Sequence, residues 1–221
     1  MKPRLCCSIM LLCCCLAGMA KNETMNAKPF VIPELKEWKG ADGTLAVSPA
    51  TSITYTEGND ALARVARQLA ADCDELLGFR PQVKPGKGSK GDIVLALKAD
   101  KKLGKEGYTI QIDKDIRLTG TQPVGVYWAT RTLLQMAEQD KNLPKGFIRD
   151  YPDYALRGFM LDCGRKFIPM AFLRDYVKIM SYYKMNAFQI HLNDNAAAKF
   201  FRDDWTRTYA AFRLESETYP G

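Results

Sequence analysis

The sequence has 221 residues, of which 47% are hydrophobic and 26% are charged, and its formal net charge is +7. These proportions exclude a disordered, collagen-like or low-complexity chain, and the sequence contains no apolar run long enough for a membrane-spanning helix. A closed (β/α)₈ barrel alone usually needs roughly 250 residues, so the chain is too short for such a barrel and a second domain.

Residues 1–20 have the composition of a secretory signal. A basic start precedes an apolar core at residues 5–17, and Gly18 and Ala20 are small residues placed for cleavage before residue 21. Such a segment directs export and is too short to span a bilayer. We therefore expect an exported protein, located in the periplasm, at the cell surface or outside the cell, with residues 21–29 forming a polar leader.

The seven cysteines fall into two groups. Five lie within the signal, where lipidation at Cys13, Cys14 or Cys15 is the alternative to simple cleavage. The residues before them are Leu or Cys rather than small, which favours a signal without a lipid anchor. Cys73 and Cys163 remain, with no C-x-x-C spacing, so we expect two buried thiols and neither a disulfide scaffold nor a zinc site.

Residues 30–150 predict one α+β domain. The expected elements are a strand at 52–56, a helix capped by Asp60 and ended by Gly78, a strand at 92–97, a hairpin of 107–113 with 115–120, and a helix beginning at Pro123. Weak alternation in the second strand indicates a central position. Clustered strands with two amphipathic helices predict a sheet with both helices on one face.

The excess positive charge of this domain gathers in a lysine-rich segment, residues 84–105. Its PGKGSKG sequence lacks the spacing of a phosphate-binding loop, and no strand leads into it with a helix after it. No aromatic residues are interleaved with the lysines, as nucleic-acid binding would require. We expect a solvated loop face and no nucleic-acid partner.

A strand–helix–strand pattern follows residues 150–154. The expected strands are 156–162 and 186–192, and Pro169 begins a helix with an apolar stripe of Leu173, Tyr176, Val177 and Met180. A crossover helix between two strands makes them parallel, and chemistry in such folds gathers at the carboxyl ends of the strands.

Both of these strands end in polar residues. The residues at the two ends are Asp162, Gly164 and Arg165, then His191, Asn193, Asp194 and Asn195. Strand parity places Gln189 and His191 on one face, opposite Phe188, Ile190 and Leu192. We expect the apolar face to meet the helices, and Gln189 and His191 to face the interior of an incomplete barrel.

Several segments resemble glycoside hydrolase family 20, the β-N-acetylhexosaminidases. RGFMLDCGRKFIP (157–169), YKMN (183–186) and IHLND (190–194) resemble the start of the catalytic barrel of that family. EGYT (106–109) and GVYWATRTLLQ (125–135) are similar to the family's smaller N-terminal α+β domain. The resemblance covers residues 30–221 and implies that residues 151–221 form the first βαβ unit of an incomplete (β/α)₈ TIM barrel.

The resemblance also implies roles for individual residues. Arg165 matches an arginine that binds hydroxyls of the terminal N-acetylhexosamine, and a guanidinium fork suits vicinal hydroxyls; the alternative is a pair with a loop carboxylate. Asp194 matches an aspartate that supports the active site, the alternative being a cap or loop residue. His191 matches a histidine of the same strand, but we favour a barrel-core histidine. We expect Asp162 and Arg157 to be architectural.

The family mechanism that this resemblance implies uses the substrate's own 2-acetamido oxygen as the nucleophile, without metal or organic cofactor. An adjacent Asp-Glu pair orients the acetamido group and protonates the leaving oxygen. We expect that pair beyond Gly221, so this chain alone should not turn over substrate. Asp74-Glu75 belongs to the small domain, and Asp203, Asp204, Glu215 and Glu217 lie where the family makes substrate or structural contacts.

The chain also departs from the family pattern. Many members have Asp-Asp and a nearby Trp-Arg after the His-Leu, whereas here Asp194 is followed by NAAA and a longer insertion before Trp205. This difference leaves the leaving-group preference open. We expect the intact enzyme to remove terminal β-linked GlcNAc or GalNAc from glycans. The alternative is a non-catalytic exported glycan-binding or scaffold fragment, and an anionic-polymer binder ranks third.

Overall fold

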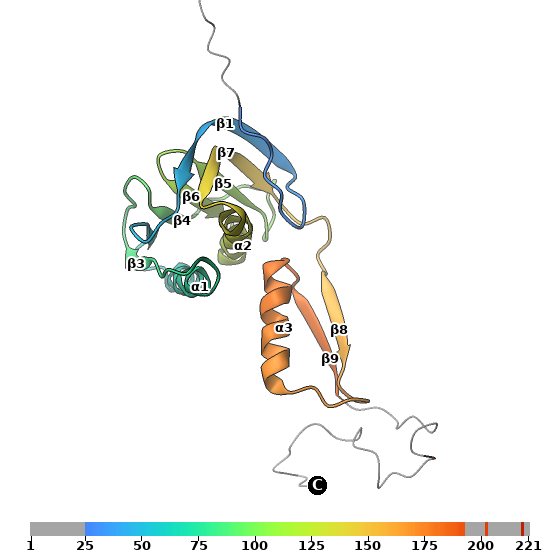
Figure 1. Ribbon diagram of the computed structural model, residues 1–221. Coiled ribbons are helices and arrows are strands. Elements are labelled where there is room, and N and C mark those ends of the chain that lie inside the picture. The colour runs from blue at the N-terminus through green and yellow to red at the C-terminus, as the bar shows by residue number, and fades with distance from the viewer. Residues whose placement is uncertain (1–24, 193–201, 203–217, 219–221) are drawn as a thin grey trace, which may run out of the picture.

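The computed structural model describes residues 25–192 together with Arg202 and Thr218, and it contains two sheets (Figure 1). The elements are β1 (Glu37–Ala46), β2 (Ser52–Tyr55), α1 (Asp60–Leu77), β3 (Gln82–Pro85), β4 (Ile93–Leu97), β5 (Tyr108–Ile112), β6 (Ile116–Gly120), α2 (Pro123–Gln139), β7 (Asn142–Asp150), β8 (Gly158–Asp162), α3 (Met170–Tyr182) and β9 (Ala187–His191). Strands β1 to β7 with α1 and α2 are called the N-terminal domain below, and β8, α3 and β9 are called the βαβ unit.

The N-terminal domain is built on a mixed seven-stranded sheet in the order β1-β7-β5-β6-β4-β2-β3. The predicted hairpin is present as the antiparallel pair β5 and β6, and the predicted central strand is present as β4, between β6 and β2. Ile148, Ile110, Leu118 and Leu95 lie opposite one another along four neighbouring strands. They are almost completely buried, so this row forms the floor of the core.

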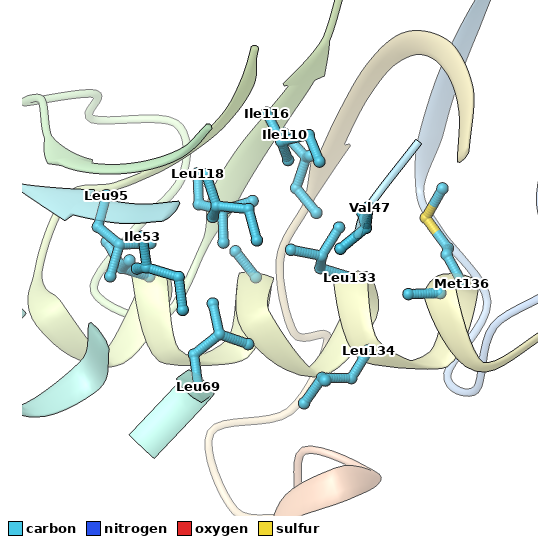
Figure 2. Close-up of a cluster of buried hydrophobic side chains, with 14 of the residues drawn as sticks. Val47, Ile53, Leu69, Leu95, Ile110, Ile116, Leu118, Leu133, Leu134 and Met136 are labelled. Carbon is cyan, nitrogen blue, oxygen red and sulfur yellow. The ribbon is translucent and has the colours of Figure 1, made fainter. Parts of the chain in front are cut away.

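Helices α1 and α2 cover the same face of this sheet, as predicted (Figure 1). Leu69 of α1 and Leu133 of α2 point toward Ile53 and Leu118 of the sheet, and the cluster is shown in Figure 2. Burial of these apolar side chains is the main contribution to the stability of the domain. The two remaining cysteines, Cys73 and Cys163, are buried thiols as expected.

The ends of α1 confirm one prediction and correct another. Gly78 adopts a left-handed conformation (φ 79°) after the last helical residue, which is the predicted stop. The N-cap, however, is Asn59 and not Asp60, because the Asn59 side chain accepts a hydrogen bond from the Leu62 N–H at 3.0 Å. Asp60 lies inside the first turn, where its charge favours the helix dipole.

Three strands were not predicted. β1 is mostly exposed, with its polar and glycine residues giving no alternation, and it forms through pairing with β7. β7 does alternate, with Leu143 and Ile148 buried, but Pro144 and Gly146 interrupt the pattern. β3 is a four-residue edge strand that pairs with β2 alone.

Asn26, expected in the polar leader, donates to the carbonyls of Gly43 and Lys145.

The βαβ unit contains the predicted parallel pair β8 and β9, connected by α3. Phe159 and Phe188 lie opposite each other, and both rings contact Tyr176 of α3, which confirms the helix-facing side of β9 for Phe188. Ile190, predicted on the same face, is 38% exposed. The predicted apolar stripe of α3 is partly wrong, because Leu173 and Met180 are buried whereas Val177 is 50% exposed. None of the helices in the described residues combines the length and apolar character that crossing a bilayer requires.

Candidate functional site

The carboxyl ends of β8 and β9 bring Asp162 and the predicted site residue His191 to one end of the βαβ unit. Asp162 lies opposite His191 in the parallel register, and the Cys163 N–H donates to the His191 carbonyl at 2.9 Å, which extends the ladder. Aligned positions of parallel strands share a face, so Asp162 and His191 lie on the side away from α3. His191 is half-buried there.

Arg165 follows β8 in a loop that Asp162 organises. One carboxylate oxygen of Asp162 accepts the backbone N–H groups of Gly164 and Arg165, at 3.0 and 3.2 Å. The other carboxylate oxygen lies 3.1 Å from Nη1 of Arg165. Asp162 therefore holds the conformation of this loop, and Arg165 forms the carboxylate pair that was its alternative role. The Arg165 side chain is 59% exposed, and its role in sugar binding stays a prediction.

The acidic residues named in the sequence separate into two sets. Asp194, Asp203, Asp204, Glu215 and Glu217 lie outside the described residues. Asp74 and Glu75 lie on the exposed surface of α1, away from the strand ends, as expected. Asp74 lies 3.5 Å from Arg80, and Glu75 lies 3.2 Å from Lys178 of α3.

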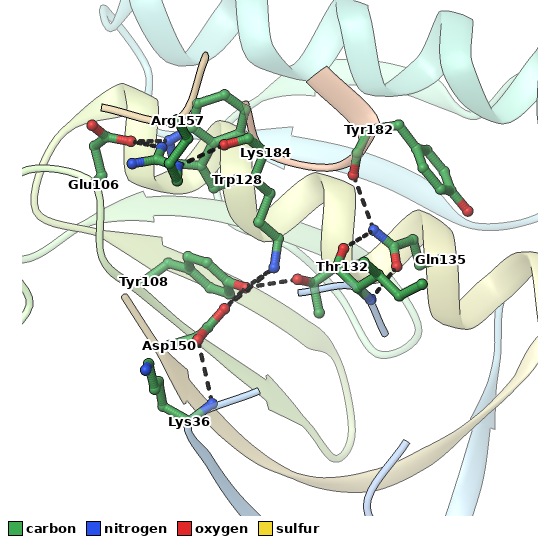
Figure 3. Close-up of polar contacts among 11 residues, drawn as sticks. Lys36, Glu106, Tyr108, Trp128, Thr132, Gln135, Asp150, Arg157, Tyr182 and Lys184 are labelled. Atoms are coloured by element: carbon green, nitrogen blue, oxygen red, sulfur yellow. Dashed lines mark hydrogen bonds and ion pairs between the residues drawn. The ribbon is translucent and has the colours of Figure 1, made fainter. Parts of the chain in front are cut away.

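The structure adds a polar cluster that the sequence did not reveal, at the opposite end of the βαβ unit (Figure 3). Lys184 of the loop after α3 reaches Asp150 and Tyr108 of the N-terminal domain, and Arg157 forms an ion pair with Glu106. Cavities of about 670 and 690 Å³ lie along the contact between the two parts of the chain, and neither lining includes Arg165 or His191.

Burial shifts the ionisation of this cluster. Burial and the charge of Asp150 raise the pKa of Tyr108 well above its ordinary value, which keeps the phenol protonated. Burial lowers the pKa of Lys184, against the opposing effect of Asp150. Burial acts to raise the pKa of Glu106, but hydrogen bonds from Arg157 and Trp128 outweigh it and lower that pKa below its ordinary value.

Across the described residues, no group of three or more His, Cys, Asp or Glu side chains is arranged to hold a metal ion. At the described strand ends, the guanidinium of Arg165 and the imidazole of His191 can form hydrogen bonds, next to the carboxylate of Asp162.

Comparison with known proteins gives the chain its family. The model of glycosyl hydrolase family 20, domain 2, matches residues 28–151, and the model of the glycosyl hydrolase family 20 catalytic domain matches residues 154–204. The chain belongs to glycoside hydrolase family 20. The two matched ranges correspond to the N-terminal domain and to the βαβ unit with the residues after it.

Relatives agree with this assignment to family 20. The chain is 27% identical over 169 residues to a β-hexosaminidase of Vibrio furnissii and 26% identical over 231 residues to one of Porphyromonas gingivalis. These alignments cover 75% and 95% of the chain but 26% and 27% of the relatives. The chain thus spans about a quarter of the length of these two relatives.

A solved structure shows the same fold. The family 20 β-N-acetylhexosaminidase of Streptomyces coelicolor A3(2) superposes with a TM-score of 0.62 at 26% identity, covering 74% of this chain and 35% of that one. The mixed sheet with its helices is therefore a fold that this chain shares with family 20 enzymes.

Proposed function

We propose that this chain is part of an exported, exo-acting enzyme that removes terminal β-linked N-acetylhexosamine, GlcNAc or GalNAc, from glycans. Membership of family 20 supports the reaction class, and the secretory composition of residues 1–20 supports export. The single observation that carries the proposal is the parallel βαβ unit with Arg165 and His191 at its strand ends. In this proposal the unit is the first one of a (β/α)₈ barrel.

The residues of this chain contribute to substrate positioning. Arg165 donates from its guanidinium fork to vicinal hydroxyls of the terminal sugar, while Asp162 fixes where the guanidinium lies. A guanidinium has five N–H donors, so its pair with Asp162 is compatible with donation to two hydroxyls. His191 and Asp194 support the site from the second strand. The 2-acetamido oxygen of the substrate is the nucleophile, and no cofactor takes part.

Hydrolysis also needs a general acid, and we propose that these 221 residues alone lack one. One oxygen of the Asp162 carboxylate accepts two backbone hydrogen bonds and the other pairs with Arg165, so both oxygens are engaged within the loop. We therefore expect the chain to bind the sugar without cleaving it.

The test is an assay of the purified chain with an aryl N-acetyl-β-glucosaminide, together with binding of N-acetylglucosamine measured by NMR. We expect no turnover, and saturable binding that Arg165→Ala weakens roughly tenfold or more, because hydrogen bonds to a charged group are lost. Lys166→Ala, at the neighbouring exposed position, is the matched control and should bind like the wild type.

Two results would overturn parts of this proposal. Turnover by the wild-type chain that Arg165→Ala abolishes would contradict the inactivity of these residues alone. Sugar binding that Arg165→Ala leaves unchanged would contradict the role of Arg165 and favour a non-catalytic glycan-binding protein.

A further inference from the structure

The two basic residues Arg157 and Lys184 occupy equivalent places in the βαβ unit. Arg157 immediately precedes β8, and Lys184 lies in the short turn between α3 and β9. Both side chains leave the unit and enter the N-terminal domain, where each meets a carboxylate (Figure 3). Each strand is therefore attached at its amino end, whereas the site residues lie at the carboxyl ends.

Lys184 completes a buried hydrogen-bond chain. Its Nζ donates to the Tyr108 hydroxyl at 2.7 Å and lies 3.2 Å from Oδ2 of Asp150. The Tyr108 hydroxyl donates its one hydrogen to Asp150 at 2.5 Å, so the Thr132 hydroxyl, 2.6 Å away, must donate to Tyr108. The Lys36 N–H donates to the other oxygen of Asp150 at 3.3 Å. The side chains of Lys184 and Asp150 are more than 90% buried, and their charges balance.

Arg157 forms the second attachment and connects it to the first. Its guanidinium pairs with Glu106, and its Nε donates to the Lys184 carbonyl at 2.8 Å. Glu106 also accepts from the Trp128 indole at 2.8 Å and from the Asn186 side chain at 3.2 Å. Glu106 thereby binds residues that precede both strands, which relates β8 and β9 to one point of the N-terminal domain.

The backbone at Lys184 is unusual for a lysine. After α3, the Lys184 N–H donates to the Ser181 carbonyl and the Met185 N–H donates to the Met180 carbonyl, which is the Schellman pattern of hydrogen bonds. This pattern puts Lys184 in the left-handed region, with φ 58°. Glycine is the favoured residue there because it has no Cβ. A strained lysine is expected to persist where its side chain is needed.

The βαβ unit has little core of its own that could fix its position. Its large apolar side chains that are exposed in the structure are Phe159, Met160, Phe167, Met170, Phe172, Val177, Ile179 and Ile190. Among the described residues, the attachments at the amino ends of the strands therefore help to fix where the βαβ unit lies relative to the N-terminal domain.

We propose that Arg157 and Lys184, with their partners Glu106 and Asp150, form a clamp by which the N-terminal domain sets the positions of β8 and β9. Lys184 is a positioning residue in this clamp. It acts on Asp162 and His191 through the strands and does not touch a ligand. The N-terminal domain thereby takes part in forming the candidate site at the far end of the βαβ unit. This inference does not depend on the reaction proposed above.

The test measures the order of the two strands in the full chain. Hydrogen exchange of peptides spanning 158–162 and 187–191 reports on the strands directly. The rate at which iodoacetamide labels Cys163, compared with Cys73, reports on the carboxyl end of β8 against the core of the N-terminal domain. We expect Lys184→Met and Lys184→Gly to accelerate both readouts at the strands about a hundredfold, because one partner of a buried pair is removed. Exchange in β5 and β6 should change much less, and Lys184→Arg should restore part of the protection.

The matched control is Lys178→Met. Lys178 also connects the two parts of the chain, through Glu75, but both side chains are about 60% exposed, so exchange should change by no more than a few-fold. The double variant Asp150→Asn with Lys184→Met removes both charges of the buried pair. If Lys184→Met alone also accelerates hydrogen exchange in β5 and β6, the double variant should restore their protection while β8 and β9 still exchange fast. Wild-type or slower exchange of the strands in Lys184→Gly would overturn the proposal, because the position would then need only its backbone conformation. Equal effects of Lys184→Met and Lys178→Met would overturn it as well.

Discussion

The N-terminal domain and the βαβ unit obtain their order in different ways. In the N-terminal domain, two helices and seven strands share one buried apolar core. In the βαβ unit, the buried apolar side chains are Cys163, Leu173 and Met180, and many large apolar residues face solvent. The unit is held chiefly at one end, by polar contacts with the N-terminal domain. The βαβ unit thus has its strand–helix–strand arrangement although it buries few apolar side chains of its own.

The largest expected effect concerns the apolar core of the N-terminal domain. Leu118→Ala should lower the free energy of unfolding by about 2–5 kcal/mol, because it removes a fully buried side chain at the centre of the sheet and leaves a cavity. Met160→Ala, in exposed β8, should change it by no more than about 0.5 kcal/mol. Urea denaturation followed by circular dichroism measures both. Equal losses would show that the βαβ unit has a core comparable to that of the N-terminal domain.

A pH titration tests the attachment of the βαβ unit. The pKa of Glu106 is lowered in the folded chain, so its contribution to stability is present above its ordinary pKa of 4.5 and is lost as the pH falls below that value. Glu106→Gln should make the free energy of unfolding less dependent on pH between about pH 6 and about pH 3. Near neutral pH, the same substitution should lower the free energy of unfolding by about 1–3 kcal/mol. Chemical denaturation at each pH gives the two curves. Curves of the same steepness would contradict the ion pair with Arg157.

The smallest expected effect concerns the N-terminal end of α1. Asn59→Ala should destabilise by about 1 kcal/mol because it removes the side-chain cap of α1. Asp60→Ala removes only a charge near the helix dipole and should cost about 0.3–1 kcal/mol. Thermal unfolding of the two variants, with Asn59→Asp as the control that keeps the cap, compares them. A larger loss for Asp60→Ala would restore Asp60 as the cap.

Local signals in the sequence were sufficient for part of the fold. The helical spacing after residue 60, the stop at Gly78 and the hairpin around residue 114 are properties of short segments, and the structure contains all three. β1 and β7 form through each other, across about a hundred residues, and neither has a clean alternating pattern. Pairing between distant segments leaves little trace in a single sequence, so these strands were missed.

The sequence likewise predicted only part of the candidate site. Strand parity predicted that His191 lies on the face away from α3, and the parallel register places it opposite Asp162. The clamp was not predictable, because Lys184 looks like an ordinary helix-end lysine and its partners Tyr108 and Asp150 come from two other strands. The role of Arg165 stays a prediction that sugar binding can test, and Asp194 lies outside the described residues.

The position of β7 in the sheet has a mechanical consequence. β7 pairs with β1 on one side and β5 on the other, both antiparallel, and the chain passes from its end directly toward β8. A force that pulls on the βαβ unit therefore acts along an interior strand, which can slide out only by shearing two ladders of hydrogen bonds at once. Under tension, the side-chain contacts of the clamp should break and residues 151–157 should extend before the strands of the sheet separate. Tension would separate the two parts of the chain while leaving the seven-stranded sheet intact.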